Sequence, residues 1–210
     1  ITHSPEVVEM LQSFDIPVMI EYSSYEQHPL GKVEWVKFFG AMTGREAEAE
    51  AAFAEQTEIL AKVSSGEKTG KTVAFFYVTS NGLIQVRQST DYIPKLIELA
   101  GGRYIFEDLE DSGSGRSTMN MQIEDFYAGA RDADILIYNS SIDGGVTTVE
   151  ELIGKCNILK NFKAVQEGQV YCTTNDMYQQ SMAIGYLLQD MHTVLTESDT
   201  GELRYLFPLQ

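Results

Sequence analysis

Residues 65–73, SGEKTGKTV, carry the glycines, lysine and threonine that a phosphate-binding loop would use. That motif needs four residues between its two glycines, so that successive backbone N–H groups surround the phosphates. Here three residues separate Gly66 from Gly70. The motif also follows a strand and opens a helix, whereas this stretch follows a helical pattern and precedes the apolar run TVAFFYV. The sequence therefore predicts a solvated helix-to-strand connection and no nucleotide site.

The residue types that carry nucleophilic, redox or metal chemistry are too scattered for a catalytic site. Cys156 and Cys172 stand too far apart for a C-x-x-C redox or zinc pair; they form one disulfide in an extracellular chain or remain free, buried thiols. His3, His28 and His192 have no metal-ligand spacing, and no serine lies in a nucleophile-elbow glycine pattern. We therefore predict no catalytic residues, no metal ligands and no cofactor, in a protein that is not an enzyme.

One arginine and several amides and hydroxyls are candidate ligand contacts. Arg87 lies beyond an Asn-Gly hairpin signal, with Ser80 and Asn81 close by in sequence, and a planar guanidinium suits carboxylates or an oxyanion. Asn139 and Ser140 follow the apolar run DILIY and could donate hydrogen bonds to ligand oxygens. The alternatives are a surface position for the arginine and ordinary turn chemistry for the other residues.

Aromatic and imidazole side chains form a second group of candidates. Tyr25 and His28 lie in the loop YSSYEQHPLG, which follows an apolar run of strand type, and loops at the carboxyl ends of strands are where open α/β sheets bind ligands. These two side chains and Trp35 could contact a metal chelate or stack on a macrocycle; packing between lobes and capping are the alternative. Tyr178, which opens the last helical pattern, either reaches a cleft or packs in the core.

The composition limits the partners that this chain can have. It has 210 residues, 43% of them hydrophobic, which is enough for a packed core, and a net charge of −16. Such an excess of negative charge argues against nucleic acid and anionic membranes as partners, and it permits docking to a basic protein surface. The first residues, ITHSPEVVEM, lack the basic and apolar regions of a signal peptide.

The elements that would position the candidate residues alternate between helix and strand. A short helix is expected up to about Phe14, and IPVMIEY follows as an apolar strand of a parallel sheet. Residues 45–63, rich in Ala, Glu and Leu, form the strongest helical pattern and are predicted to be a stiff spacer. From residue 72 onward strands alternate with helices, which predicts a mainly parallel sheet of about four strands between two helical layers.

This organisation divides the chain into three parts. Residues 1–44 are predicted to be the remnant of one α/β lobe, residues 45–64 a helix between lobes, and residues 65–210 a complete three-layer α/β/α lobe. The first part cannot close a sheet of its own. The fold class is therefore α/β, with one complete lobe, a long connecting helix and a remainder of a second lobe.

Several stretches resemble the solute-binding proteins of ABC importers for iron complexes (siderophore or haem) and cobalamin, in which one backbone helix joins two α/β lobes. The resemblance runs over nearly the whole chain. In the stretch EDFYAGARDADILI, the match to the recurring segment of that family has a length difference of two residues. Members of that family are longer, which implies that residues 1 to about 30 are the last unit of an N-terminal lobe and that most of this lobe is missing through truncation or proteolysis. The stretches are HPLGKVEWVKFFGAMTGREAEAEAAF, AGGRYIF, STMNMQIEDFYAGARDADILIYNSS, EDFYAGARDADILI and LKNFKAVQEGQVYCTT.

The resemblance implies a function and partners. The chain is expected to capture an iron complex or related metal chelate outside the cytoplasm, as a periplasmic protein or a cell-surface lipoprotein, and to deliver it to a permease whose separate ATPase subunit handles ATP. Cobalamin and oxyanions such as molybdate are the alternative ligands, and an enzyme or metal-cofactor protein built on a similar lobe is the rival class. A homodimer that covers the sheet edge left by truncation is also expected.

The resemblance further implies a docking role for Glu124. The acidic residue that begins the corresponding helix in cobalamin-type members lies on the outer surface of its lobe and pairs with arginines of the permease. An exposed carboxylate steers docking to a basic surface and can pair bidentately with arginine. The alternative is an ordinary glutamate in the first turn of a helix, where the helix dipole favours negative charge.

Overall fold

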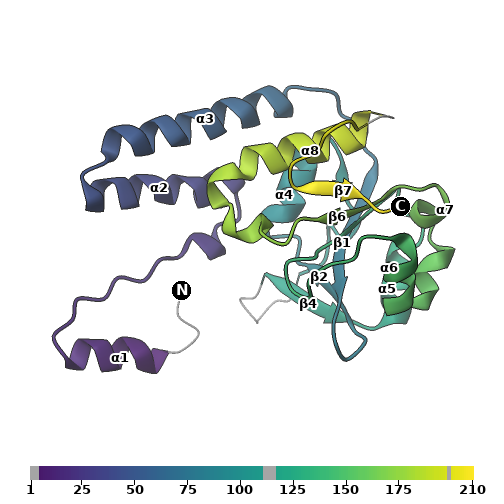
Figure 1. Cartoon of the computed structure of the whole chain (residues 1–210), viewed down its shortest axis with the longest axis horizontal. Helices are drawn as coiled ribbons and strands as arrows, with labels where there is room; N and C mark the ends of the chain where they lie inside the picture. The colour runs from purple at the N-terminus through teal and green to yellow at the C-terminus, as the bar shows by residue number, and fades with distance from the viewer. Residues whose placement is uncertain (1–4, 111–116, 198–199) are drawn as a thin grey trace.

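The computed structural model describes residues 5–110, 117–197 and 200–210. A seven-stranded sheet forms its centre, in the order β4-β2-β1-β5-β6-β7, with β3 also pairing with β1 (Figure 1). The strands are β1 (Thr72–Val78), β2 (Ile84–Arg87), β3 (Arg103–Tyr104), β4 (Thr118–Met121), β5 (Ile135–Tyr138), β6 (Val170–Thr173) and β7 (Leu206–Pro208).

The middle of the sheet is parallel. β1 pairs in parallel with β3 and β5, and β5 pairs in parallel with β6. All four residues of β5 and all four of β6 are buried. Strands that are covered by helices on both faces have continuous apolar sequences, because both of their faces are buried. For this reason VAFF, ILIY and VYCT could be identified as strands. The predicted α/β fold class is confirmed.

Antiparallel strands flank the parallel middle. The predicted hairpin connects β1 to β2 through a turn in which Gly82 has a φ of 80°, a conformation that favours glycine. β4 then pairs with β2, and β7 with β6, both antiparallel. The sequence did not predict β4 or β7, because TMNM and LFP are short and carry no clear alternation.

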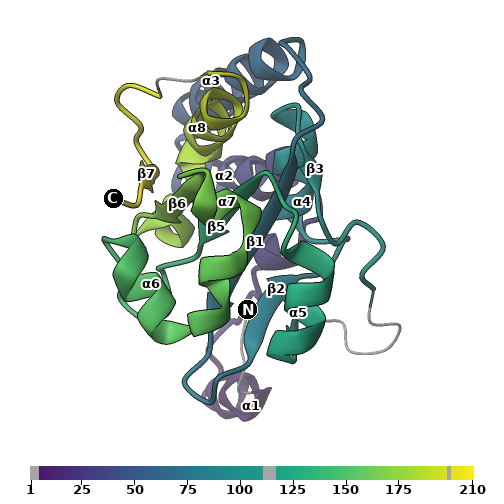
Figure 2. The ribbon, with the colours of Figure 1, turned by 90° about the vertical axis from the view of Figure 1, so that its right-hand side faces the viewer.

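Helices cover both faces of the sheet (Figure 2). One core cluster joins α3, α4 and α8 to β1 residues such as Phe75. The other joins α5, α6 and α7 to the opposite face, where Phe126 lies 4.8 Å from Phe76 and 5.5 Å from Phe162, measured between ring centroids. The three predicted layers are therefore present. These helices are α3 (Glu46–Ser64), α4 (Tyr92–Leu99), α5 (Ile123–Ala130), α6 (Val149–Lys155), α7 (Lys163–Gln166) and α8 (Ile184–Thr196).

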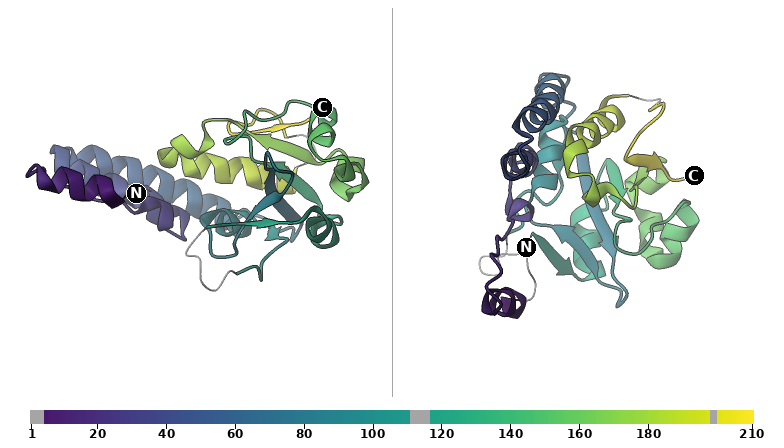
Figure 3. Two further views of the ribbon diagram at one scale, coloured as in Figure 1. Left: turned by 90° about the horizontal axis from the view of Figure 1, so that it is seen from below. Right: turned by 60° about the vertical axis from the view of Figure 1, so that its left-hand side comes forward.

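The predicted spacer helix is present as α3, which is uninterrupted over 19 residues. It runs back along α2 (Pro29–Thr43), and the two helices extend together from the sheet (Figures 1 and 3). Gly44, with a φ of 66°, ends α2 in the left-handed conformation that is common at helix C-termini. A Cβ on Gly40 would lie 2.5 Å from the Ala49 Cβ, so only glycine permits this approach of the two helices. The division into two lobes stays a prediction.

The expected strand at residues 16–22 is wrong. A helix, α1 (Pro5–Ser13), precedes it as predicted, but residues 16–22 belong to no strand. Ile16 and Met19 are 46% and 62% exposed. No strand of the described chain lies beside this segment, and a strand needs a neighbour for its backbone hydrogen bonds. An apolar run indicates β-propensity and does not supply that partner.

The last helix also starts later than predicted. Two single turns of 3-10 helix, η3 (Met177–Gln179) and η4 (Ser181–Ala183), precede α8. Gln56 of α3 fixes the start of α8, because its Oε1 accepts a hydrogen bond of 2.8 Å from the Gly185 N–H. No helix among the described residues combines the length and the apolar character needed to cross a membrane.

The segment after α8 is held by one buried carboxylate. Asp190, 5% exposed, accepts hydrogen bonds from the N–H groups of Arg204, Tyr205 and Leu206 at 2.9, 2.6 and 3.1 Å. Burial raises the pKa of Asp190, and the three N–H donors partly oppose that shift. These bonds direct the chain into β7, which completes the sheet beside β6.

Candidate functional site

A buried ion pair lies at the end of β2. Arg87 is 9% and Asp91 6% exposed, and 3.5 Å separates Arg87 Nη1 from Asp91 Oδ2. The Tyr104 hydroxyl bridges the backbone of Arg87, accepting from its N–H at 3.0 Å and donating to its C=O at 2.8 Å. Asp91 also caps α4, where it accepts from the Ile93 N–H at 2.9 Å. Burial raises the pKa of Asp91, and the Arg87 charge opposes that rise.

Two aromatic rings face the guanidinium of Arg87. Its Cζ lies 5.0 Å from the ring centroid of Tyr178 and 5.8 Å from that of Phe75. Cation–π contacts within about 6 Å are favourable and become stronger when water is excluded. Arg87 is therefore a desolvated, oriented cation and not the surface arginine that was the alternative.

The carboxyl end of β5 joins this cluster. Asn139, 2% exposed, donates from Nδ2 to the Tyr178 hydroxyl at 3.1 Å. Ser140 turns the other way: its N–H donates to Thr173 Oγ1 at 3.0 Å, and its hydroxyl donates to the Thr173 C=O. The structure thus brings together Arg87, Asn139 and Tyr178, while Ser140 links β5 to β6.

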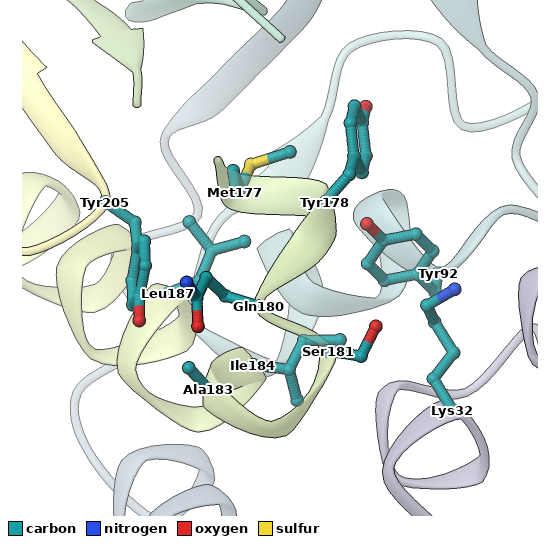
Figure 4. A pocket seen from close by; sticks show the side chains of 10 residues that line it. All are labelled: Lys32, Tyr92, Met177, Tyr178, Gln180, Ser181, Ala183, Ile184, Leu187 and Tyr205. Carbon is teal, nitrogen blue, oxygen red and sulfur yellow. The ribbon is translucent and has the colours of Figure 1, made fainter. Parts of the chain in front are cut away.

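A second cation approaches from α2. Lys32 Nζ lies 4.6 Å from the ring centroid of Tyr92 and donates to the Ser23 C=O at 3.2 Å. Burial lowers the pKa of Lys32, and the charge of Asp91 opposes the shift. Lys32 and Tyr92 line a small pocket together with Tyr178 and Ser181 (Figure 4). No pattern in the sequence identifies Lys32 or Tyr92, because their proximity arises from the packing of α2 against α4.

The other predicted aromatic residues lie on η1 (Ser23–Tyr25) and α2. Tyr25 is 60% exposed. His28 caps α2, where its Nδ1 accepts from the Leu30 N–H at 3.2 Å. Trp35 donates from its indole Nε1 to Glu26 Oε1 at 3.0 Å. Capping, which was the alternative for His28, is therefore present, and a ligand role for these three residues stays a prediction.

Ser80 and Asn81 lie in the turn between β1 and β2. Both are exposed, and Asn81 Oδ1 accepts from the Thr79 hydroxyl at 2.6 Å. No contact among the described residues connects them to Arg87, because Arg87 lies at the far end of β2 from this turn. Proximity in sequence was thus a poor guide to proximity in the fold.

The docking candidate Glu124 is exposed in the first turn of α5.

Both cysteines are free and buried. Of the two alternatives, a disulfide or two free thiols, the structure therefore shows two free thiols. Among the residues that the structure describes, no group of three or more His, Cys, Asp or Glu side chains could hold a metal ion.

The comparisons place the chain in a known family. A family model described as periplasmic binding protein matches residues 5–177, and the chain therefore belongs to this family, which is one of solute-binding proteins. The predicted resemblance is confirmed.

Individual relatives and structures agree with this assignment. An uncharacterized lipoprotein of Methanocaldococcus jannaschii is 30% identical over 96% of the chain, which covers 48% of that protein. Two solved structures share the fold. One is a possible iron-binding, periplasmic solute-binding protein of Staphylococcus epidermidis, with a TM-score of 0.68 and 19% identity over 92% of this chain and 72% of that one. The other is the periplasmic heme binding protein HutB of Vibrio cholerae, with a TM-score of 0.71 and 15% identity over 92% and 73%. The chain spans about half the length of the curated relatives it matches.

Proposed function

We propose that this chain is part of the substrate-binding component of an ABC importer, and that it captures an iron complex, a siderophore or haem, without catalysis. The observation that carries the proposal is the oriented guanidinium of Arg87 between the rings of Tyr178 and Phe75. An arginine in this setting offers planar hydrogen-bond donors to oxygen atoms of a bound chelate. Iron-binding and heme-binding proteins of the same fold support an iron complex as the ligand.

The proposal includes a location and partners. The relatives from M. jannaschii named as lipoproteins support an extracytoplasmic protein, periplasmic or attached to the cell surface. The partners are a membrane permease and its ATPase subunit, together with the metal-complex ligand. The expected homodimer stays a prediction, which the oligomeric state of the purified protein tests.

Titration calorimetry tests the choice of ligand. We expect hemin or a neutral ferric trihydroxamate to bind the purified protein with a Kd in the micromolar range or below, and cyanocobalamin and molybdate to give no heat of binding. Binding of cobalamin or molybdate alone would support those alternative ligands instead. If none of the four compounds binds, the proposed ligand class is wrong.

Glu124 provides a separate test of the partner. We propose that its exposed carboxylate pairs with arginines of the permease. Glu124→Arg should weaken binding to the permease about tenfold or more and leave the free energy of unfolding unchanged, because the side chain is exposed. Glu150→Arg, in the first turn of α6, is the matched control. Unchanged permease affinity in Glu124→Arg, measured in detergent or nanodiscs, would contradict the docking role.

A further inference from the structure

The two outermost strands of the sheet differ in how their outer edges are protected. β4 and β7 end the sheet, and each pairs with one neighbour on its inner side (Figure 1). The outer edge of such a strand carries N–H and C=O groups that can pair with another chain, and proteins commonly block it with a proline, a charged side chain or a covering segment. β7 is blocked in this way, and within the described residues β4 is not.

The outer edge of β7 has no free N–H group. In an antiparallel pair, the backbone groups of successive residues point alternately toward the partner strand and away from it. The Leu209 N–H donates to β6 at 2.9 Å, so the backbone groups of Leu206 and Pro208 point away from β6. Pro208 has no N–H, and the Leu206 N–H donates to Asp190 at 3.1 Å. Both outward positions are therefore closed to a further strand.

The outer edge of β4 has no such protection. Directly before β4, the Ser117 C=O accepts a hydrogen bond of 3.0 Å from the Gln88 N–H, which follows β2. By the same alternation Met119 bonds to β2, and the backbone groups of Thr118 and Asn120 point away from it. No strand or cap among the described residues receives these groups. The sequence of β4, TMNM, contains neither a proline nor a charged residue.

We propose that the outer edge of β4 pairs with the same edge of a second copy of this chain, antiparallel and about a two-fold axis at Met119. That axis places Thr118 of each copy opposite Asn120 of the other. Both pairs then exchange their N–H···O=C bonds, so every outward group of the two strands is satisfied. The half-buried Met119 side chains meet across the axis at a non-hydrogen-bonded position, where side chains lie closest, and methionine adapts its shape to such a contact.

The net charge of −16 on each copy gives this dimer a characteristic salt dependence. β4 has no charged side chain, so its pairing includes no ion pair that salt would weaken. Salt screens the repulsion between the two negative copies and should therefore strengthen their association. This dimer uses an edge of the seven-stranded sheet, whereas the sequence predicted a dimer over an edge left by truncation. It requires no ligand and goes beyond the proposed function.

Sedimentation velocity and amide hydrogen exchange of the purified chain test the proposal. We expect a monomer–dimer equilibrium with a Kd of about 10–100 μM. The dimer should be about threefold or more tighter in about 0.5 M than in about 0.1 M NaCl. The amides of Thr118 and Asn120 should exchange rapidly in the dilute monomer and slowly in the dimer, whereas the Met119 amide, which bonds to β2, should exchange slowly in both.

Two substitutions in β4 should weaken the dimer, each about tenfold or more. Asn120→Pro removes an outward N–H and keeps the bonds to β2, and edge strands tolerate proline at such positions. Met119→Lys places like charges opposite each other at the two-fold axis, although it lowers the net negative charge. Ala61→Lys is the matched control, because it makes the same change of charge at an exposed position of α3. It should associate at least as tightly as the wild type.

Three results would overturn the proposal. The first is a monomer at about 500 μM protein in both salt concentrations. The second is slow exchange of the Thr118 and Asn120 amides in the dilute monomer, because the edge would then be covered within one chain. The third is a dimer of unchanged affinity in both β4 variants, because that dimer would use another surface.

Discussion

Replacing Asp190 with alanine is expected to lower the free energy of unfolding by about 3–5 kcal/mol, since each hydrogen bond to a charged group contributes about 1.5–3 kcal/mol. The variant leaves three backbone N–H groups without their acceptor, and that of Leu206 lies in the core. Unpaired buried donors are among the few causes of very large losses from one substitution. The segment that forms β7 should then detach from β6 before the rest of the sheet unfolds.

Urea unfolding measures the global effect, and trypsin measures the local one. Cleavage after Arg204 should be much faster in Asp190→Ala, because that residue is then released from the lobe. Asp132→Ala is the control: its side chain is 84% exposed, and its loss should change stability by less than about 0.5 kcal/mol. A loss of less than about 1 kcal/mol in Asp190→Ala would show that the three hydrogen bonds are not what holds β7.

The same carboxylate has a defined pH dependence. The pKa of Asp190 is raised in the folded state above its value of 3.8 in an unfolded chain. Above 3.8, and up to its folded pKa, the folded state therefore holds a proton that the unfolded state has lost. The contribution of this group to stability is full below 3.8 and declines as the pH rises through that window. In Asp190→Asn, urea unfolding between pH 3.5 and pH 7 should lack this decline.

Replacing Arg87 with methionine should reduce both stability and ligand affinity. The variant leaves Asp91 buried without its ion-pair partner, and breaking one side of a buried pair costs about 3–5 kcal/mol. It also removes the cation from the rings of Tyr178 and Phe75. For an anionic iron complex such as hemin we expect affinity to fall about a hundredfold.

A double substitution separates the two effects. In Arg87→Met/Asp91→Asn the buried charge is gone, while asparagine still caps α4 through the Ile93 N–H. Most of the lost stability should return, but the affinity for hemin should stay low. Arg103→Met is the control, since that side chain is 52% exposed and pairs with Glu107 on the surface. Recovery of hemin affinity in the double variant would contradict a role of Arg87 in binding.

The core of the lobe was predictable because its signals are local. Three apolar runs, an Asn-Gly turn and the Asp91 cap each determine one element from a few neighbouring residues. The segment 16–22 shows the limit of such signals, because its apolar residues have the composition of a strand but no partner strand within the described chain. β4 was missed for the opposite reason: its weak sequence forms a strand because β2 already offers a free edge.

The site was predictable in part. Arg87 was identified by its type and its position beyond the hairpin turn, Asn139 by its position after a strand, and Tyr178 by its position at a helix start; the structure joins the three. Lys32 and Tyr92 could not be found in this way, because a lysine in a charged helix and a tyrosine after a cap are ordinary residues until α2 packs against α4. Long-range packing, and not spacing along the chain, creates their chemistry.

The first half of α2 gives the protein an intrinsic optical reporter. Trp35 is the sole tryptophan of the chain, and it lies one turn from Lys32 on the same helix. Its indole is fixed by Glu26 and by an edge contact with Phe38, whose ring centroid lies 5.6 Å away. Because both partners lie on α2 or directly before it, the emission of this one fluorophore would report local changes in the segment 26–38 in real time without an added label.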